Sequence, residues 1–477
     1  MDGTRRLAVL VALVAVAVGC ASAPQPTTEQ RSELPPDART VAGAITEEGL
    51  ADRLAELAAV TDASTGYRSV GSPGYDAAAD LVSTLLADAG WHVSDDAYEA
   101  NVFVDDGGSR IEVDGRSFAS DDVRPLVFAP SGEVDGPVVA IGSVDRPAAR
   151  TELGCEAGDY GALPADAIVV VPPGTCFRRD QVVAAQAAGA AAFVAAYPEA
   201  PTGSPPRTTL IDPAGLAIPA LGATGPAAEA LAATAAAGGT ARLVGDGRTT
   251  TAPTRSVLAE LPGSEPGPVV MLGAHLDSVM DGPGMNDDGS GTAALLEIAR
   301  ALGGRRPRST IRLAFWSAEE AGLIGSRHYV ESLPAADREA IVAYFNADML
   351  GSVNGYAGVY DEDGAPAGSE AVGALLRAAV ERAGATPAEV ALGGGSDHRS
   401  FIDAGVPVGG VFSGAGEPVS AAQAAGREVV AGQPADPCYH RTCDELDNVD
   451  LGLTRILATA LADVAVRVAQ NPELVRR

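Results

Sequence analysis

Apolar and polar residues alternate in two different patterns along the second half of this chain. Short apolar runs are each followed by a polar, glycine-containing loop and then by a segment in which apolar residues recur every three to four positions. The short runs predict buried strands, and the longer segments predict amphipathic helices. Strands are expected at 268–274, 310–317, 341–346 and 406–412, and helices at 291–302, 321–332, 370–383 and 453–470. This order indicates an α/β fold, with a mostly parallel central sheet covered by helices on both faces.

The first half of the chain is organised differently. Helical spacing of leucine and alanine predicts helices over 48–59 and 75–89. Over 118–247, short valine-rich runs alternate with proline and glycine turns, which is typical of a small β-rich domain. We therefore expect one discontinuous domain, formed by 41–117 and 248–477, into which the β-rich domain is inserted.

The beginning of the chain has the pattern of an export signal. Two arginines precede an apolar run over 7–18, which is too short to span a bilayer as a helix. A small residue followed by Cys20 resembles the cleavage box of bacterial lipoproteins, in which this cysteine carries the lipid. We expect a signal peptide over 1–20, a flexible tether over 21–40 and an exported, monomeric lipoprotein on the extracytoplasmic face of the cell membrane. An ordinary cleaved secretion signal is the alternative.

The charge balance excludes one class of partner. The chain of 477 residues has 63 acidic and 33 basic side chains and a formal net charge of −30. Binding to nucleic acid requires clustered lysine and arginine, and no such cluster is visible. The acidic surface provides solubility outside the cell or, alternatively, attracts cationic peptides.

The number and spacing of the cysteines are consistent with an exported protein. With Cys20 assigned to lipid, four cysteines remain, in two pairs that are close in sequence. An oxidising compartment favours disulfides, so we predict the pairs Cys155–Cys176 and Cys438–Cys443. A zinc knuckle that uses the second pair together with a histidine between them is the alternative.

Chemically active side chains follow the predicted strands. In a parallel sheet, ligands bind beyond the carboxyl ends of the strands, and all of these residues can reach one such edge. They are His275 and Asp277 after the first strand, Asp287 in the loop beyond it, Glu319 and Glu320 after the second strand, Asp348 after the third, and His440 in a late loop. The remaining histidines His92 and His328 are read as structural, and the role of His398 is left open.

Several carboxylates at one apolar edge would repel one another unless cations lay between them. Histidine nitrogen and carboxylate oxygen together suit zinc, and a pair of metals needs a bridging carboxylate. We expect two Zn²⁺ ions, the first held by His275 and Asp348, the second by Glu320 and His440, and both bridged by Asp287.

Two further residues have expected roles beside these ligands. Neighbours in an extended segment point to opposite faces, which would leave Glu319 free for proton transfer while Glu320 binds metal. Asp277 lies two residues from His275 and is expected to accept its imidazole N–H.

These motifs resemble those of the M28 family of zinc peptidases, in particular the secreted and lipoprotein aminopeptidases of actinobacteria. The matching segments are GAHLDS at 273–278, MNDDGSG at 285–291, FWSAEEAGLIGS at 315–326, NADM at 346–349, SDH at 396–398 and CYH at 438–440. Within the insertion, GC at 154–155, IVVV at 168–171, GTCF at 174–177 and AAQAAGA at 184–190 resemble the protease-associated (PA) domain.

The resemblance implies a two-zinc aminopeptidase that hydrolyses the first bond of peptides with a free N-terminus. Glu319 matches the general base, and Tyr439 matches a phenol that stabilises the oxyanion. Met349 and Phe412 match residues near the pocket for the N-terminal side chain. The metal ligands match the set expected above, and the peptide bond after Asp287 is expected to be cis. Some relatives have an arginine where this chain has Gly395, which affects contacts to the remainder of the peptide.

Three alternatives remain. A carboxypeptidase of the same superfamily would need basic residues for a C-terminal carboxylate, and no obvious set is present. A glutaminyl cyclase-like transferase uses one zinc and usually varies the ligands. A non-enzymatic binding protein is expected to lose Glu319 or a ligand, and none is lost.

Overall fold

The computed structural model describes residues 36–142, 153–198, 200, 202–203, 207–425 and 428–475. The expected signal peptide, Cys20 and most of the expected tether lie outside the described residues. The end of the tether differs from the expectation, because Ala38–Ala42 form helix α2. The Asp37 side chain accepts the backbone N–H of Thr40 at 2.9 Å, and Val41 is buried in the core. A capped helix with a buried apolar residue offsets the entropy of ordering the segment.

The larger body is built around a mixed sheet of eight strands, in the order β1-β10-β12-β11-β13-β16-β14-β15. Strands β12, β11, β13 and β16 at its centre run parallel, and β1 and β10 pair antiparallel to their neighbours. Strand β14 pairs antiparallel with β16 and parallel with β15. The strands are β1 (His92–Asp105), β10 (Gly247–Leu261), β11 (Val269–His275), β12 (Thr310–Trp316), β13 (Ile341–Ala347), β14 (Gly358–Tyr360), β15 (Ala388–Val390) and β16 (Val408–Phe412). The α/β class and the parallel centre expected from the sequence are confirmed.

Helices cover both faces of this sheet, which explains why its central strands are mostly apolar and buried. Along β11, Val270, Leu272 and Ala274 pack into the core beneath α3, α4, α7 and α13, whereas Met271 packs beneath α8 and α11. The helices of this body are α3 (Glu47–Asp62), α4 (Pro73–Asp88), α7 (Gly289–Leu302), α8 (Ile324–Ser332), α9 (Ala335–Ala340), α10 (Ser369–Arg382), α11 (His398–Asp403), α12 (Ala421–Ala424) and α13 (Leu451–Gln470).

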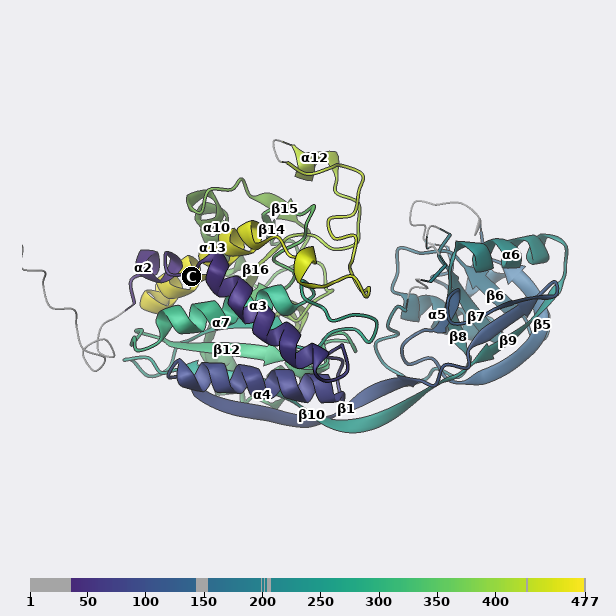
Figure 1. The fold of residues 1–477 in the computed structure, drawn as a ribbon, viewed down its shortest axis with the longest axis horizontal. Helices are drawn as coiled ribbons and strands as arrows, with labels where there is room; N and C mark the ends of the chain where they lie inside the picture. The colour runs from purple at the N-terminus through teal and green to yellow at the C-terminus, as the bar shows by residue number, and fades with distance from the viewer. Residues whose placement is uncertain are drawn as a thin grey trace, which may run out of the picture.

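A long two-stranded ribbon joins the larger body to a smaller one (Figure 1). Strands β1 and β10 pair antiparallel over their whole common length, from His92 opposite Glu260 to Asp105 opposite Gly247. The smaller body contains a second sheet in the order β3-β2-β9-β5-β6-β7-β8-β4. Its strands are β2 (Arg110–Val113), β3 (Arg116–Phe118), β4 (Val123–Pro125), β5 (Gly132–Ala140), β6 (Ile168–Val171), β7 (Ala192–Ala196), β8 (Ala220–Ala223) and β9 (Thr240–Gly245).

The second sheet begins before residue 118, at which we expect the insertion to start. Strands β2 and β3 form a hairpin, and β2 pairs with β9 through partners such as Arg110 and Val244. The sequence pattern places the boundary where valine-rich runs begin, whereas strand pairing extends the sheet to Arg110. Helices α5 (Arg178–Ala187) and α6 (Gly225–Ala236) pack in separate cores of this body.

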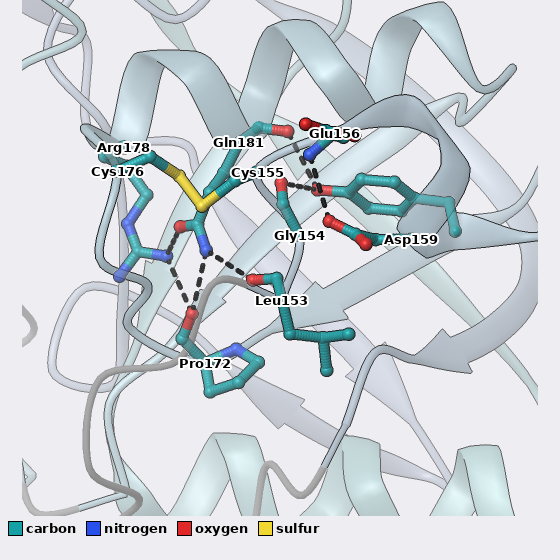
Figure 2. The surroundings of a disulfide bond; sticks show 10 residues. Leu153, Gly154, Cys155, Glu156, Asp159, Pro172, Cys176, Arg178 and Gln181 are labelled. Atoms are coloured by element: carbon teal, nitrogen blue, oxygen red, sulfur yellow. Dashed lines mark hydrogen bonds between the residues drawn. A yellow bond between two sulfur atoms is a disulfide. The ribbon is translucent and has the colours of Figure 1, made fainter.

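A disulfide secures the loop that precedes β6 (Figure 2). Cys155 and Cys176 are bonded, as the sequence predicts. Beside them, the Gln181 side-chain amide donates to the carbonyl oxygens of Leu153 and Pro172, each at 3.3 Å. Tyr160 donates its hydroxyl to the Gly154 carbonyl at 3.0 Å. The loop is therefore held by a covalent bond and by buried hydrogen bonds to α5.

Within the described ranges, none of the helices combines the length and the apolar character required to cross a membrane.

Candidate active site

His275, the last residue of β11, is buried at the carboxyl edge of the central sheet. Its Nδ1 lies 3.0 Å from the Asp277 carbonyl oxygen but 3.8 Å from the Asp277 carboxylate. The carboxylate instead accepts the backbone N–H groups of Glu319 and Glu320, at 3.1 and 3.3 Å. The expected imidazole–carboxylate hydrogen bond is therefore replaced by one to the main chain, because two amide donors already orient the Asp277 side chain.

Two adjacent aspartates in the loop before α7 have different tasks. The Asp288 carboxylate accepts the backbone N–H groups of His275, Gly291 and Met349 at 2.8–3.1 Å, so it caps α7 and ties three segments together. Asp287 faces the two histidines instead. Its Oδ1 lies 3.1 Å from His275 Nε2, and its Oδ2 lies 3.1 Å from His440 Nε2. The peptide bond between the two aspartates is cis, as the resemblance implies.

Glu319 and Glu320 lie in a turn beyond β12, which ends at Trp316. The expectation that neighbours would alternate across an extended strand was wrong, because Ala318 has φ 59° and turns the chain. Both glutamates consequently approach the cluster. Glu319 Oε2 lies 4.0 Å from His275 Nε2, and Glu320 Oε2 lies 3.1 Å from His440 Nε2.

The third strand and a late loop complete the cluster. Asp348 directly follows β13, and its Oδ1 lies 3.6 Å from His275 Nε2. His440 lies inside the Cys438–Cys443 loop, stacked on Tyr439 with ring centroids 3.8 Å apart. Because the two cysteine sulfurs are bonded to each other, they are not free to bind metal, and the alternative of a zinc knuckle is excluded.

The charges of the cluster depend on one another. Burial opposes the protonation of His275, but the surrounding carboxylates, led by that of Glu319, outweigh it and raise the pKa of His275 well above its usual value. His440 behaves in the same way, with Glu320 as the main carboxylate. Burial raises the pKa of Glu319 well above the usual range. Divalent cations bound among these carboxylates would take the place of the histidine protons.

The arrangement of oxygen atoms fits metal ions. Within the described residues, no hydrogen bond reaches the buried atoms Glu320 Oε1 or Asp348 Oδ1, and Asp287 Oδ2 accepts none of regular geometry although His440 Nε2 lies 3.1 Å away. Buried carboxylate oxygens are normally hydrogen-bonded, so these three oxygens on three expected ligands are suited to contact cations. Two sets of ligand atoms lie within 4.8 Å of one another, His275 with Asp287 and Glu320, and His275 with Asp288 and Asp348. Asp288 already accepts three backbone N–H groups, and we therefore do not count it as a ligand.

Two residues that position the candidate ligands were not identified from the sequence. Asp444, just after the second disulfide, accepts the backbone N–H groups of Asn286 and Asp287 at 2.8 and 3.0 Å. Arg68, fully buried between α3 and α4, donates to the carbonyl oxygens of Leu276, Pro283 and Gly284. These two residues fix the segment between His275 and Asp287. Their pairing with residues more than 150 positions away has no local sequence signal.

Replacing Arg68 with methionine is expected to lower the free energy of unfolding by about 3 kcal/mol or more, because three interior carbonyl oxygens lose a charged donor. Calorimetric unfolding measures this change. Arg248→Met is the control, because its side chain is 58% exposed and pairs with Asp106 at the surface, where an ion pair contributes at most about 1 kcal/mol. Equally small effects in the two variants would contradict the assigned role.

A cavity of about 860 Å³, partly open to solvent, adjoins the cluster. His275, Asp287, Glu319 and Asp348 lie in its wall, together with Met349, Phe412, Tyr439, His398 and Gly395. Desolvation beside the carboxylates of Asp287 and Glu320 raises the pKa of Tyr439 well above its usual value, so the phenol keeps its proton. His398 Nε2 donates a hydrogen bond to the Leu392 carbonyl oxygen at 2.7 Å.

Two family models and several known proteins match this chain in sequence. Residues 256–465 match peptidase family M28, and residues 134–231 match the PA domain. A probable lipoprotein aminopeptidase of Mycobacterium tuberculosis is 34% identical over 432 residues, which cover 85% of this chain and 81% of that protein. An aminopeptidase of Pseudomonas aeruginosa is 33% identical over 436 residues, which cover 89% of this chain and 81% of that protein.

Solved structures confirm the fold. An aminopeptidase from Aneurinibacillus sp. strain AM-1 superposes with a TM-score of 0.71 at 23% identity, covering 91% of this chain and 96% of that one. A zinc aminopeptidase from Bacillus subtilis gives a TM-score of 0.69 at 21% identity, and the match covers 90% of this chain and 96% of that one. Together with the sequence matches, these likenesses lead to one assignment: the chain belongs to peptidase family M28 and carries a PA domain.

Proposed function

We propose that the protein is a zinc-dependent aminopeptidase that removes single residues from peptides with a free N-terminus. The observation that carries this proposal is the shared position of Asp287, whose two oxygens each lie 3.1 Å from a different histidine. Asp348 and Glu320 flank those histidines, so two sets of three ligands share one carboxylate. The names of the relatives from Mycobacterium and Pseudomonas support the same activity.

Two zinc ions fit this set of donors. His275, Asp287 and Asp348 would hold one ion, and Asp287, Glu320 and His440 the other. Imidazole nitrogen and carboxylate oxygen are ligands that zinc accepts in tetrahedral sites. When bound, zinc supplies Lewis acidity and lowers the pKa of water toward about 7.

Residues beside the ligands supply proton transfer and oxyanion stabilisation. Glu319 belongs to neither ligand set and lies in the wall of the cavity. Its carboxylate would accept a proton from the attacking water and pass it to the leaving amine. Tyr439, whose phenol keeps its proton, would donate a hydrogen bond to the carbonyl oxygen as negative charge develops there.

The cavity favours a substrate amine over a substrate carboxylate. None of its described lining residues is a lysine or an arginine, whereas several are carboxylates. A carboxypeptidase needs a cation to hold the C-terminal carboxylate, so this alternative is not favoured. The N-terminal side chain would lie against Met349 and Phe412, both of which line the cavity.

Export is part of the same proposal. A lipid on Cys20 would hold the monomeric enzyme at the extracytoplasmic face of the cell membrane. The lipoprotein-like sequence before Cys20, the lipoprotein name of the mycobacterial relative and the two disulfides support this location.

An assay with aminoacyl-p-nitroanilides and their N-acetylated forms tests the activity. We expect hydrolysis of the free-amine substrates only, loss of activity after zinc removal by a chelator, and recovery when zinc is restored. The side-chain preference follows from the same panel. Hydrolysis of N-acetylated substrates at the same rate, or no hydrolysis of any substrate by the zinc-loaded protein, would contradict the proposal.

A further inference from the structure

A second cavity, partly open to solvent, lies between the PA domain and the peptidase domain. Glu320 and His440 of the candidate metal cluster are among its lining residues. Val127 and Thr209 of the PA domain contribute to its wall, and they are partners in an isolated parallel β-bridge. His440 also lines the first cavity, so the two cavities meet at the cluster.

The wall of this second cavity is mainly apolar. Val70, Val102, Phe103, Val127 and Phe128 all line it. They come from the loop before α4, from strand β1 of the ribbon and from the PA domain. An apolar side chain that entered this space would lose contact with water and gain contact with these groups.

Arg207 and Asp281, two charged residues of this wall, are already in ion pairs. Arg207 Nη2 lies 2.7 Å from Asp105 Oδ2, and Arg207 Nε lies 3.5 Å from Asp281 Oδ2. The Arg207 side chain is only 7% exposed, and Arg124 also pairs with Asp281. A charged substrate group would therefore have to compete with existing ion pairs, and a buried charge without a partner is costly.

The PA domain is packed directly against the turn that carries Glu319 and Glu320. A Cβ atom on Gly322, which has φ +109°, would lie only 2.8 Å from Ile211 Cγ2 of the PA domain. Ala318 and Ala321 from the same turn share one apolar core with Leu126 and Phe128. The PA-domain wall of the cavity thus contacts the turn that carries the two glutamates of the cluster.

We infer that this second cavity is the subsite for the side chain of the substrate's second residue, which follows the scissile bond, and that it selects apolar side chains. The inference rests on the proposed function. A peptide whose first side chain lies against Met349 and Phe412 has its scissile bond at the cluster. Its next side chain then reaches the cavity that adjoins Glu320 and His440. The PA domain would thereby help to determine which peptides are cleaved.

The test compares tripeptides that differ only in the second residue, using the full-length mature protein loaded with zinc. We expect kcat/KM for leucyl-leucyl-glycine to exceed that for leucyl-glycyl-glycine by roughly tenfold or more, as is usual for an apolar pocket. The aspartyl and lysyl analogues should fall at or below the glycyl peptide. In Val127→Phe and Thr209→Phe, the added ring fills the cavity, and the leucyl-to-glycyl ratio should fall to near one.

A matched variant accompanies the test. Val183→Phe makes the same change on α5, where the side chain is 39% exposed and does not line the cavity, and should keep the wild-type ratio. A wild-type ratio near one, or an unchanged ratio in both phenylalanine variants with wild-type melting temperatures, would overturn the inference. Failure of wild type to cleave leucyl-glycyl-glycine would instead overturn the proposed function.

Discussion

Glu319→Gln is expected to lower kcat by about 10²–10⁴-fold, the usual contribution of a general base, while the protein keeps its full zinc content. Glutamine has nearly the same shape but cannot accept a proton from water at neutral pH. Glu319 lies outside both proposed ligand sets, 4.0 Å from His275 Nε2, so metal binding should not depend on its charge. Steady-state kinetics on a leucyl-p-nitroanilide substrate and elemental analysis of dialysed protein measure the two quantities.

A control substitution at a surface glutamate distinguishes a specific loss of catalysis from a general effect of replacing glutamate by glutamine. Glu331→Gln, at an exposed position of α8, should have wild-type kinetics and metal content. A Glu319→Gln variant that lost its zinc together with its activity would show that this residue is a ligand. A variant that remained active would remove Glu319 from the mechanism.

Asp287→Ala is expected to remove both zinc binding and activity. Asp287 is the only described residue whose two carboxylate oxygens each lie within 3.1 Å of a different cluster histidine, so its loss would affect both ions. The rate should fall by more than about 10³-fold, since water without a metal returns to a pKa of about 15.7. Zinc content by elemental analysis and kcat/KM on the same substrate are the measurements.

A matched substitution and a zinc titration make this result specific. Asp88→Ala, at an exposed position of α4, should bind zinc as wild type does. Binding of two ions by Asp287→Ala with unchanged affinity would disprove the bridging role. Binding of one ion with partial activity would show that a single site is sufficient for hydrolysis.

The sequence alone was sufficient to predict the fold class and to identify side chains that gather at the carboxyl edge of the central sheet. Buried strands and amphipathic helices have distinct periods, and these periods gave the central parallel strands, most of the large helices and their order. The ends of the strands then identified His275, Asp287 and Asp348 as neighbours, because parallel strands have their carboxyl ends at one edge. Both disulfides could be predicted because each joins cysteines that are close along the chain.

Only the tertiary structure decided how these side chains are aimed. The turn at Ala318 brings both Glu319 and Glu320 to the cluster, which strand alternation did not predict. The Asp277 carboxylate accepts the backbone N–H groups of Glu319 and Glu320 instead of the imidazole N–H of His275. The local sequence holds no signal for these choices, because they depend on which distant donors and acceptors meet.

The same limit applies to the residues that hold the site together. Arg68 reaches carbonyl oxygens 208–216 positions away, and Asp444 holds amides more than 150 positions away. The cavity between the two domains is formed by segments that no single motif contains. Sequence periodicity determined which residues are buried and where strands end, whereas long-range packing determined which of those residues meet and in what orientation.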